Sequence, residues 1–147
     1  MPVPKRIVAA TDFSEHSDRA LNYALDIAKA CEAQVFLVHV VETIQQCVND
    51  YCISEGTVRQ IEEQSMQAAR EKMRTEVENL TRIRKVGITF DVRIGKAAEE
   101  ILKEQEDKKA DLIIVGSHGR SSLIGHLTGS VADKVVHHAG CPVLLVR

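Results

Sequence analysis

Short apolar runs alternate along the chain with segments of helical period, and this alternation limits the possible folds more than any other feature. Residues 34–41 read QVFLVHVV, a β-branched run typical of strands that are buried on both faces of a parallel sheet. Apolar runs at 6–10, 111–115 and 143–146 predict further strands, and residues 88–94 alternate apolar and polar side chains as a half-buried edge strand does.

Between these strands, apolar residues recur at spacings of three and four, which predicts helices. The helical segments are the stretch after Ser14, a long stripe from Val58 to Leu80, residues 97–108 and residues 130–138. Ser14 or Asp12 is expected to be the N-cap of the first helix, and Gly87 is expected to stop the second. Residues 42–57 show no clear period and are interpreted as a loop.

The resulting order, β-α-β-α-β-α-β-α-β, is typical of one parallel sheet with helices on both faces. We therefore predict a single α/β domain over residues 1–147, with a doubly wound sheet that winds outward in both directions from its first strand. Ligands of such sheets bind beyond the carboxyl ends of the strands, where the strand order reverses. Residues 10–12 and the segment from Gly116 onward are expected to lie there.

The composition narrows the classes of function. Lys and Arg total 19 against 21 Asp and Glu, a net charge of −2, and the aromatic residues are three Phe and two Tyr. A nucleic-acid partner is not expected, because such binding relies on a basic surface or stacking aromatic residues. No apolar run reaches the roughly 18 residues of a membrane span, and the first residues show no signal-peptide pattern, so we expect a cytoplasmic protein without membrane attachment.

Four cysteines are too few for a disulfide scaffold: Cys31, Cys47, Cys52 and Cys141. We interpret Cys47 and Cys52 as two unpaired loop thiols, and a regulatory disulfide or thiol sensor is the alternative. His137, His138 and Cys141 could suggest a metal site. Adjacent histidines on a helix point in different directions, however, and no Cys-x2-Cys pair accompanies them, so no metal is expected.

The segment 116–130, GSHGRSSLIGHLTGS, follows a predicted strand and precedes a predicted helix. Its glycines let backbone N–H groups approach an anion, and Gly129-Ser130 opens a helix whose N-terminus favours negative charge. This indicates a phosphate site, and a loop that merely makes tight turns is the alternative. The chain contains no GxxxxGK[ST] sequence and no G-x-G-x-x-G after the first strand, so P-loop and dinucleotide sites are not expected.

The spacing Gly116-x2-Gly119-x9-Gly129-Ser130 resembles the G-2x-G-9x-G-[S/T] nucleotide signature of the universal stress protein family. The residues 10–14 (ATDFS), 38–40 (VHV) and 141–146 (CPVLLV) also fall where that family has its counterparts, so the resemblance covers essentially the whole chain. It implies a Rossmann-like sheet of order 3-2-1-4-5, similar to the adenine nucleotide alpha hydrolases. It also implies a homodimer, and ATP binding in members that carry the signature.

The resemblance also implies roles for individual residues. Asp12 would contact the adenine, with Ala10 and Thr11 beside it and the backbone of Val40 closing on the base; the family commonly has a proline in place of Ala10. The remaining expected site residues would hold the ribose and phosphates or lie beside them: Gly116, Ser117, His118, Gly119, Arg120, Gly129, Ser130 and Val131.

Several of these residues have a simpler interpretation. Asp12 could be a helix N-cap, and Arg120 could be a solvated arginine rather than a partner of phosphate. Ser121 and Ser122 are interpreted as loop residues. His118 lies in the loop, where it could reach the ligand, whereas His39 lies in an apolar run and is interpreted as a core histidine.

The combined expectation is an ATP-binding stress-response protein that senses or regulates and is not a fast enzyme, because no nucleophile–base pair stands out. Its cofactor would be ATP, with or without Mg²⁺. It would form a homodimer through residues 143–146, since this apolar run is expected at an open sheet edge. The alternatives are a slow adenine-nucleotide hydrolase, which would cleave between the α- and β-phosphates, and an interaction module that binds no nucleotide.

Overall fold

A computed structural model describes residues 2–48, 51–119 and 128–147 of the chain. The described strands and helices are β1 (Arg6–Ala10), α1 (Glu15–Cys31), β2 (Gln34–Glu42), β3 (Cys47–Val48), β4 (Tyr51–Cys52), α2 (Glu55–Arg84), β5 (Ile88–Gly95), α3 (Ala97–Lys108), β6 (Leu112–Gly116), α4 (Ser130–His138) and β7 (Val143–Val146). The predicted bounds of α3, α4 and β7 match those of the structure.

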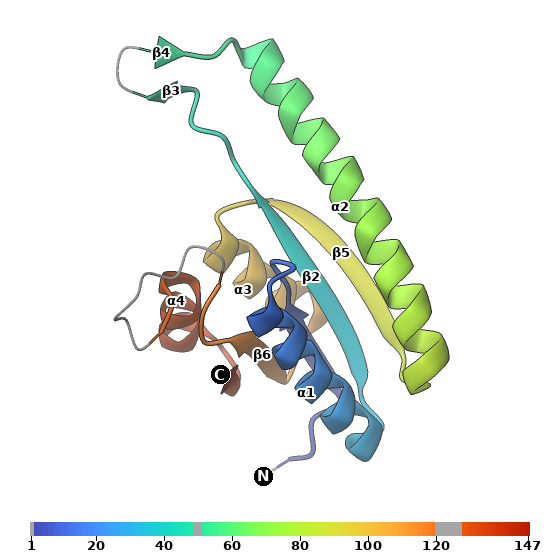
Figure 1. Ribbon diagram of the computed structural model, residues 1–147. Coiled ribbons are helices and arrows are strands. Elements are labelled where there is room, and N and C mark those ends of the chain that lie inside the picture. The colour runs from blue at the N-terminus through green and yellow to red at the C-terminus, as the bar shows by residue number, and fades with distance from the viewer. Residues whose placement is uncertain (1, 49–50, 120–127) are drawn as a thin grey trace.

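The main sheet is parallel and has five strands in the order β5-β2-β1-β6-β7 (Figure 1). Since β3 and β4 belong to a separate small hairpin, this order is 3-2-1-4-5 when the strands of the sheet are counted along the chain. The sheet therefore winds outward in both directions from β1, as predicted. The order reverses between β1 and β6, and β5 and β7 are the edge strands.

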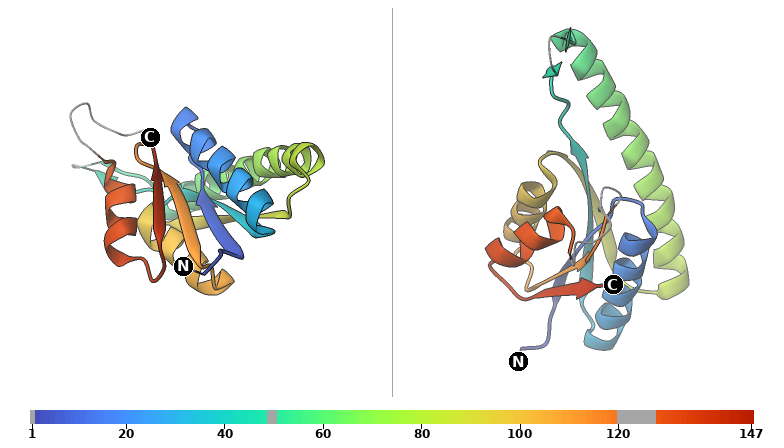
Figure 2. Two further views of the ribbon diagram at one scale, coloured as in Figure 1. Left: turned by 90° about the horizontal axis from the view of Figure 1, so that it is seen from below. Right: turned by 60° about the vertical axis from the view of Figure 1, so that its left-hand side comes forward.

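Helices cover both faces of the sheet (Figure 2). Successive side chains of a strand point to opposite faces. In β1, Ile7 and Ala9 therefore join a core with α1 and α2, whereas Val8 joins a second core with α3 and α4. All three side chains are fully buried, which explains why the run at 6–10 is continuously apolar.

The ends of the helices differ in part from the predicted ones. Ser14 is the N-cap of α1, because its hydroxyl accepts a hydrogen bond from the backbone N–H of Ser17 at 3.3 Å. The prediction that Gly87 stops α2 is wrong. The helix ends at Arg84, and Lys85 adopts the left-handed conformation with φ of 54°, so that its N–H reaches the carbonyl of Thr81.

The N-terminal part of α2 extends beyond the sheet, together with the β3–β4 hairpin (Figure 1). Residues 43–48, 51–54 and the first two turns of α2, 55–62, form a projection that we call the arm. The predicted apolar stripe of α2 is buried at Ala69, Met73 and Val77, but Ile61 is 39% exposed because the helix has passed the end of the sheet there.

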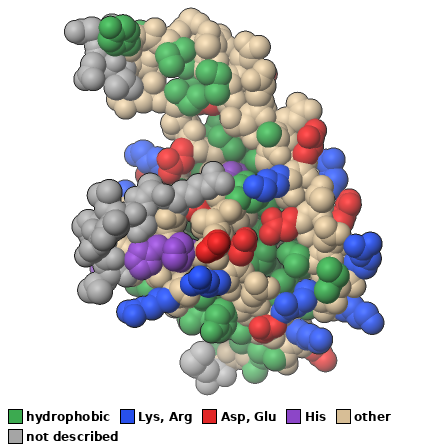
Figure 3. Space-filling view, viewed as in Figure 1, with side chains coloured by type: hydrophobic (Ala, Val, Ile, Leu, Met, Phe, Trp, Pro, Cys, Tyr) green, Lys and Arg blue, Asp and Glu red, His purple; other side chains and the backbone are tan. Residues whose placement is uncertain are grey.

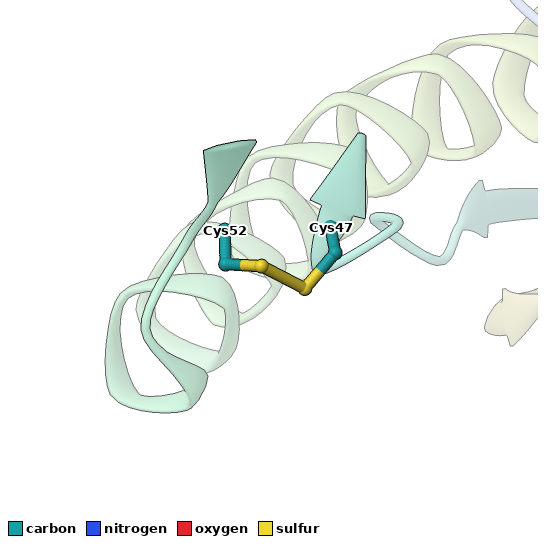
Figure 4. The surroundings of a disulfide bond; sticks show 2 residues. All are labelled: Cys47 and Cys52. Carbon is teal, nitrogen blue, oxygen red and sulfur yellow. A yellow bond between two sulfur atoms is a disulfide. The ribbon is translucent and has the colours of Figure 1, made fainter. Parts of the chain in front are cut away.

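The interpretation of residues 42–57 as a loop is wrong, and so is that of Cys47 and Cys52 as unpaired thiols. β2 runs on to Glu42, and an antiparallel hairpin places the two cysteines directly opposite each other, with their Cα atoms 4.1 Å apart. A disulfide joins them (Figure 4). Cys31 and Cys141 are free thiols, and burial raises the pKa of Cys141.

Among the described residues, no helix is both long enough and apolar enough to cross a membrane. α2 has 30 residues, but its exposed faces carry many charged side chains.

Candidate functional site

A cavity of about 400 Å³ lies at the carboxyl ends of β1, β2 and β6, where the strand order reverses. Its walls contain every expected site residue that the structure describes: Ala10, Thr11, Asp12, Val40, Gly116, Ser117, His118, Gly119, Gly129, Ser130 and Val131. Arg120, Ser121 and Ser122 lie outside the described residues. The sequence segments 10–12 and 116–131, far apart along the chain, therefore meet at one site.

The turn after β1 is held by a short network of hydrogen bonds. Thr11 donates its backbone N–H to the carbonyl of Val38 at 2.9 Å, and its hydroxyl accepts from the N–H of Phe13 at 3.0 Å. Asp12 Oδ1 accepts from the N–H of Ser14 at 3.0 Å. Since Ser14 is the N-cap of α1, the interpretation of Asp12 as that cap is wrong, and its carboxylate lines the cavity.

Two glycines allow the loop after β6 to approach this turn. A Cβ atom on Gly119 would lie only 2.8 Å from Asp12 Oδ2, and one on Gly116 would lie 3.1 Å from the backbone carbonyl of His16. Side chains at either position would displace a neighbour. Gly116 and Gly119 are therefore needed for close contact between the two segments.

Ser117 connects the loop that follows β6, which we call the glycine loop, to β7 and to the start of α4 by hydrogen bonds. Its N–H donates to the carbonyl of Val146 in β7 at 2.7 Å, and its own carbonyl accepts the N–H of Gly129 at 2.6 Å. The side chain is 2% exposed, and its hydroxyl lies 2.9 Å from Nδ1 of His118. These bonds hold the start of the loop beside the start of α4.

The N-terminus of α4 faces the cavity with Gly129 as its N-cap. Glycine has no side chain, so within the described part of the chain no side-chain cap hydrogen bond satisfies the first-turn N–H groups. Ser130 and Val131, the first residues of the helix, line the cavity. Among the described lining residues, these backbone groups and the helix dipole are the source of positive potential for an anion.

Sequence reasoning missed part of the wall: Ser17, Val38, His39, Glu42, Ala97, Ile101, Val115 and Ala132. His39, which was expected to be a core residue, is half-buried and lines the cavity. Its Nδ1 lies 2.8 Å from the carbonyl oxygen of Thr11. A carbonyl only accepts, so Nδ1 carries the proton and donates it. The position of His39 near the carboxyl end of β2 was the available signal.

His137 and His138, two of the residues considered for a metal site, each form a hydrogen bond with the backbone of α4. Nδ1 of His137 donates to the carbonyl of Asp133 at 2.8 Å, and Nδ1 of His138 donates to the carbonyl of Lys134 at 2.9 Å. Within residues 2–48, 51–119 and 128–147, no group of three His, Cys, Asp or Glu is arranged to hold a metal ion.

An ionic cluster links β5 to α3, the helix that supplies Ala97 and Ile101 to the cavity. Arg93 contacts Glu100 at 3.0 Å, Glu104 at 2.7 Å and Asp107 at 3.0 Å. Burial raises the pKa of Glu104, whose side chain is fully buried, and the neighbouring Asp91 adds to this shift. Hydrogen bonds from Lys103 and Arg93 lower the pKa of Glu100.

The comparisons with known proteins agree with this arrangement. The model of the universal stress protein family matches residues 4–147. The chain belongs to the universal stress protein family. A family member from Methanocaldococcus jannaschii is 36% identical over 143 residues, a match that covers 97% of this chain and 82% of the relative.

Solved structures of the family show the same fold. UspA of Lactobacillus plantarum superposes with a TM-score of 0.85 at 21% identity and covers 97% of both chains. A universal stress protein in complex with cAMP has a TM-score of 0.71 at 23% identity, with 99% of both chains covered. One from Archaeoglobus fulgidus in complex with dAMP has a TM-score of 0.63 at 19% identity and covers 99% of this chain and 100% of that one.

Proposed function

We propose that the cavity binds an adenine nucleotide, with ATP as the physiological ligand, and that the protein is a nucleotide-dependent sensor or regulator in the stress response. The observation that carries this proposal is the meeting of Asp12, Gly119 and the N-terminus of α4, whose N-cap is a glycine, around one cavity. The family members solved with cAMP and dAMP support it, because both ligands contain adenine.

The side of the cavity formed by β1 and β2 suits the base. Val38, Val40 and Ile101 offer apolar surface, and the Asp12 carboxylate offers an acceptor for the exocyclic amino group of adenine. Although Oδ1 accepts from Ser14, a carboxylate can accept several hydrogen bonds. Guanine presents a carbonyl oxygen where adenine has this amino group, so Asp12 favours adenine.

The side formed by the glycine loop and α4 suits the phosphates. The backbone N–H groups at Ser130 and Val131 point their partial positive charge toward a bound anion, and the side-chain-free Gly119 and Gly129 allow it to come close. Mg²⁺ would neutralise part of the phosphate charge when it is bound with ATP. The residues present therefore fit a nucleotide with its phosphates on α4.

We further propose that the nucleotide is retained and not rapidly turned over. Asp12 and Glu42 are the carboxylates among the described lining residues, and Asp12 is engaged with Ser14 and faces Gly119. The hydroxyl of Ser117 does pair with His118, but Ser117 is 2% exposed, so this hydroxyl is poorly placed to attack a bound nucleotide. The proposal includes a homodimer, which would pair through β7, and a cytoplasmic location.

The test begins with the protein as purified, without added nucleotide. It is denatured, and released small molecules are identified by chromatography and mass spectrometry; we expect stoichiometric ATP or ADP. The stripped protein is then titrated with MgATP and MgGTP, and we expect at least tenfold tighter binding of MgATP. Product formation should stay far below the roughly 1 s⁻¹ at the low end of ordinary enzymes.

Two results would contradict the proposal. An empty protein that ignores added ATP would favour an interaction module on the same fold. Steady release of AMP at enzymatic turnover would instead favour an adenine-nucleotide hydrolase.

A further inference from the structure

The arm carries its disulfide into solvent, away from the nucleotide site. Cys47 and Cys52 are both exposed, and Tyr51 beside them is 84% exposed. In the space-filling view the arm rises above the body of the molecule, with hydrophobic side chains on its surface (Figure 3). A dissolved thiol can therefore approach the sulfur atoms without any opening of the fold.

The disulfide is not part of what holds the body together. It joins residues separated by only five positions, and within the described residues neither hydrophobic core contains a residue of the arm. The arm has its own attachments, because Ile53 donates its N–H to the carbonyl of Gln46 at 2.8 Å, and Ile44 donates to Glu62 Oε1 at 3.1 Å. Opening of the disulfide therefore leaves the sheet and its helices intact.

The two remaining thiols are less exposed than Cys47 and Cys52, because both are of intermediate burial. Cys31 packs against the core between β1 and α1, and Cys141 packs against the core beside α4. Burial raises the pKa of Cys141, which lowers the fraction of reactive thiolate at neutral pH. Among the described residues, Cys47 and Cys52 are thus the most exposed cysteines, and they are joined in a disulfide.

We propose that the Cys47–Cys52 disulfide is a redox-reactive site that exchanges electrons with dithiols, either small molecules or the vicinal cysteines of a partner protein. The hairpin supports both states of the site. Because its antiparallel register holds the two residues opposite each other, the reduced thiols stay close enough to pair again.

The exchange is balanced without a further reactant. One thiolate of the dithiol attacks Sγ of either cysteine, the Sγ–Sγ bond breaks, and the departing cysteine leaves as a thiolate that takes up a proton. The second thiol of the dithiol, as its thiolate, attacks the mixed disulfide and releases the other cysteine, which is protonated in turn. Two electrons and two protons pass to the protein, and the dithiol becomes a cyclic or intramolecular disulfide. The reverse reaction restores Cys47–Cys52.

The experiment uses the full chain with Cys31→Ser and Cys141→Ser, so that only the proposed pair can react. The folded protein is incubated with reduced dithiothreitol, quenched with an alkylating reagent and weighed by intact mass spectrometry. We expect two adducts to appear together, at a rate within about tenfold of that in denaturant, because an exposed bond needs no global unfolding. If the reduced protein is freed of dithiothreitol and treated with oxidised dithiothreitol or oxidised glutathione before the quench, neither adduct should form, and the far-UV circular dichroism should stay unchanged.

The control is the variant with Cys47→Ser and Cys52→Ser in the native background, which should neither gain this paired reaction nor lose its fold. Reduction more than about tenfold slower in the folded protein than in denaturant would overturn the proposal, because the bond would then be protected by structure. Failure of the two thiols to re-form the bond in oxidised buffer would also overturn it.

Discussion

A single methyl group added at Gly119 would change the cavity by displacing the carboxylate of Asp12. Replacement of Gly119 by alanine places a Cβ atom 2.8 Å from Asp12 Oδ2, so the carboxylate must move away from its position beside the loop. We predict that Gly119→Ala weakens MgATP binding at least tenfold, which is about 1.4 kcal/mol. Isothermal titration of the stripped protein measures this change.

Gly56→Ala is the matched control, because a Cβ atom on Gly56 meets no atom within 4 Å. This substitution should leave MgATP affinity unchanged and stabilise α2 slightly, since alanine is the better helix former. Equal affinities of the Gly119→Ala variant and the native protein would contradict the placement of the nucleotide against Asp12.

At the scale of residues, the sequence identified the part of the site that carries a recognisable pattern. The glycines, Asp12 and Val40 follow from spacing or family resemblance, and the structure brings them together. His39 and Glu42 could not be assigned in this way. Their contact with the cavity depends on how far β2 extends beyond β1, which is a property of strand register and not of local sequence.

Among the elements, β5 and α3 depend on one buried charge. Arg93 is 22% exposed and neutralises Glu104, whose side chain is fully buried. Loss of Arg93 would leave Glu104 as an unpaired charge between the two elements. We predict that Arg93→Met lowers the free energy of unfolding by about 3–5 kcal/mol, the usual cost of breaking a buried pair. Urea denaturation at pH 7 measures it.

The matched control is Arg59→Met on the arm. Arg59 also faces a glutamate, Glu55 at 3.5 Å, but both side chains are largely exposed. Solvent screens such a pair, so this variant should unfold at the same urea concentration as the native protein. A similar effect of both substitutions would contradict the assigned role of Arg93.

Glu104 also predicts a pH dependence. Its pKa is raised in the folded protein by burial, so its contribution to stability is complete below the pKa of the unfolded chain and is lost as pH rises through the folded value. Glu104→Gln removes this titration and keeps an acceptor for Arg93. The stability of the variant relative to the native protein should therefore increase between about pH 4.5 and pH 8, as measured by urea denaturation. A constant difference over this range would contradict the raised pKa.

Elements with a clear periodic or apolar pattern were predictable, whereas the β3–β4 hairpin of the arm was not. The stripe of α3 and the short apolar run of β7 each define one element without ambiguity. β3 and β4 each have two residues, too few to show the alternation that identifies a strand. The pairing of β3 with β4, and with it the disulfide, depends on β2 and α2, which hold the two ends of the hairpin.

At the scale of the whole molecule, we expect the proposed homodimer to form at the open sheet edge of β7. Pro142 and Val146 direct their carbonyls toward β6, accepting from Ile113 and Ser117 at 3.0 and 2.7 Å, so the intervening alternate residues, Val143 and Leu145, direct theirs outward. We predict that Leu145→Pro converts the proposed homodimer to a monomer, because it removes an outward N–H. Light scattering with size-exclusion chromatography measures the mass.

Leu145→Ala is the control for this substitution, since it shortens the same side chain and retains the N–H. The alanine variant should stay dimeric at the concentration where the proline variant is monomeric. Dimers in both variants would place the interface elsewhere, and a monomeric native protein would contradict the dimer itself.

The topology of the whole chain was the most predictable feature. The consecutive apolar residues 35–38 of β2 are all buried, which requires helices on both faces of a parallel sheet. The overhang of α2 was not predictable, because the polar and apolar pattern continues through Val58 and Ile61 although no sheet lies beneath them.

Because of this overhang, a small tilt of α2 would move the arm by a larger distance than it moves the part of the helix on the sheet. Met73 is fully buried against the sheet, and Lys72 beside it holds its ammonium 4.1 Å above the ring of Phe13, the residue that follows Asp12. The helix runs about 27 Å from Met73 to its start, at 1.5 Å per residue. A tilt of α2 by about 5° about Met73 would therefore move the start of the helix by about 2 Å. Small displacements of the turn that holds Asp12 would thus be magnified at the far end of the arm.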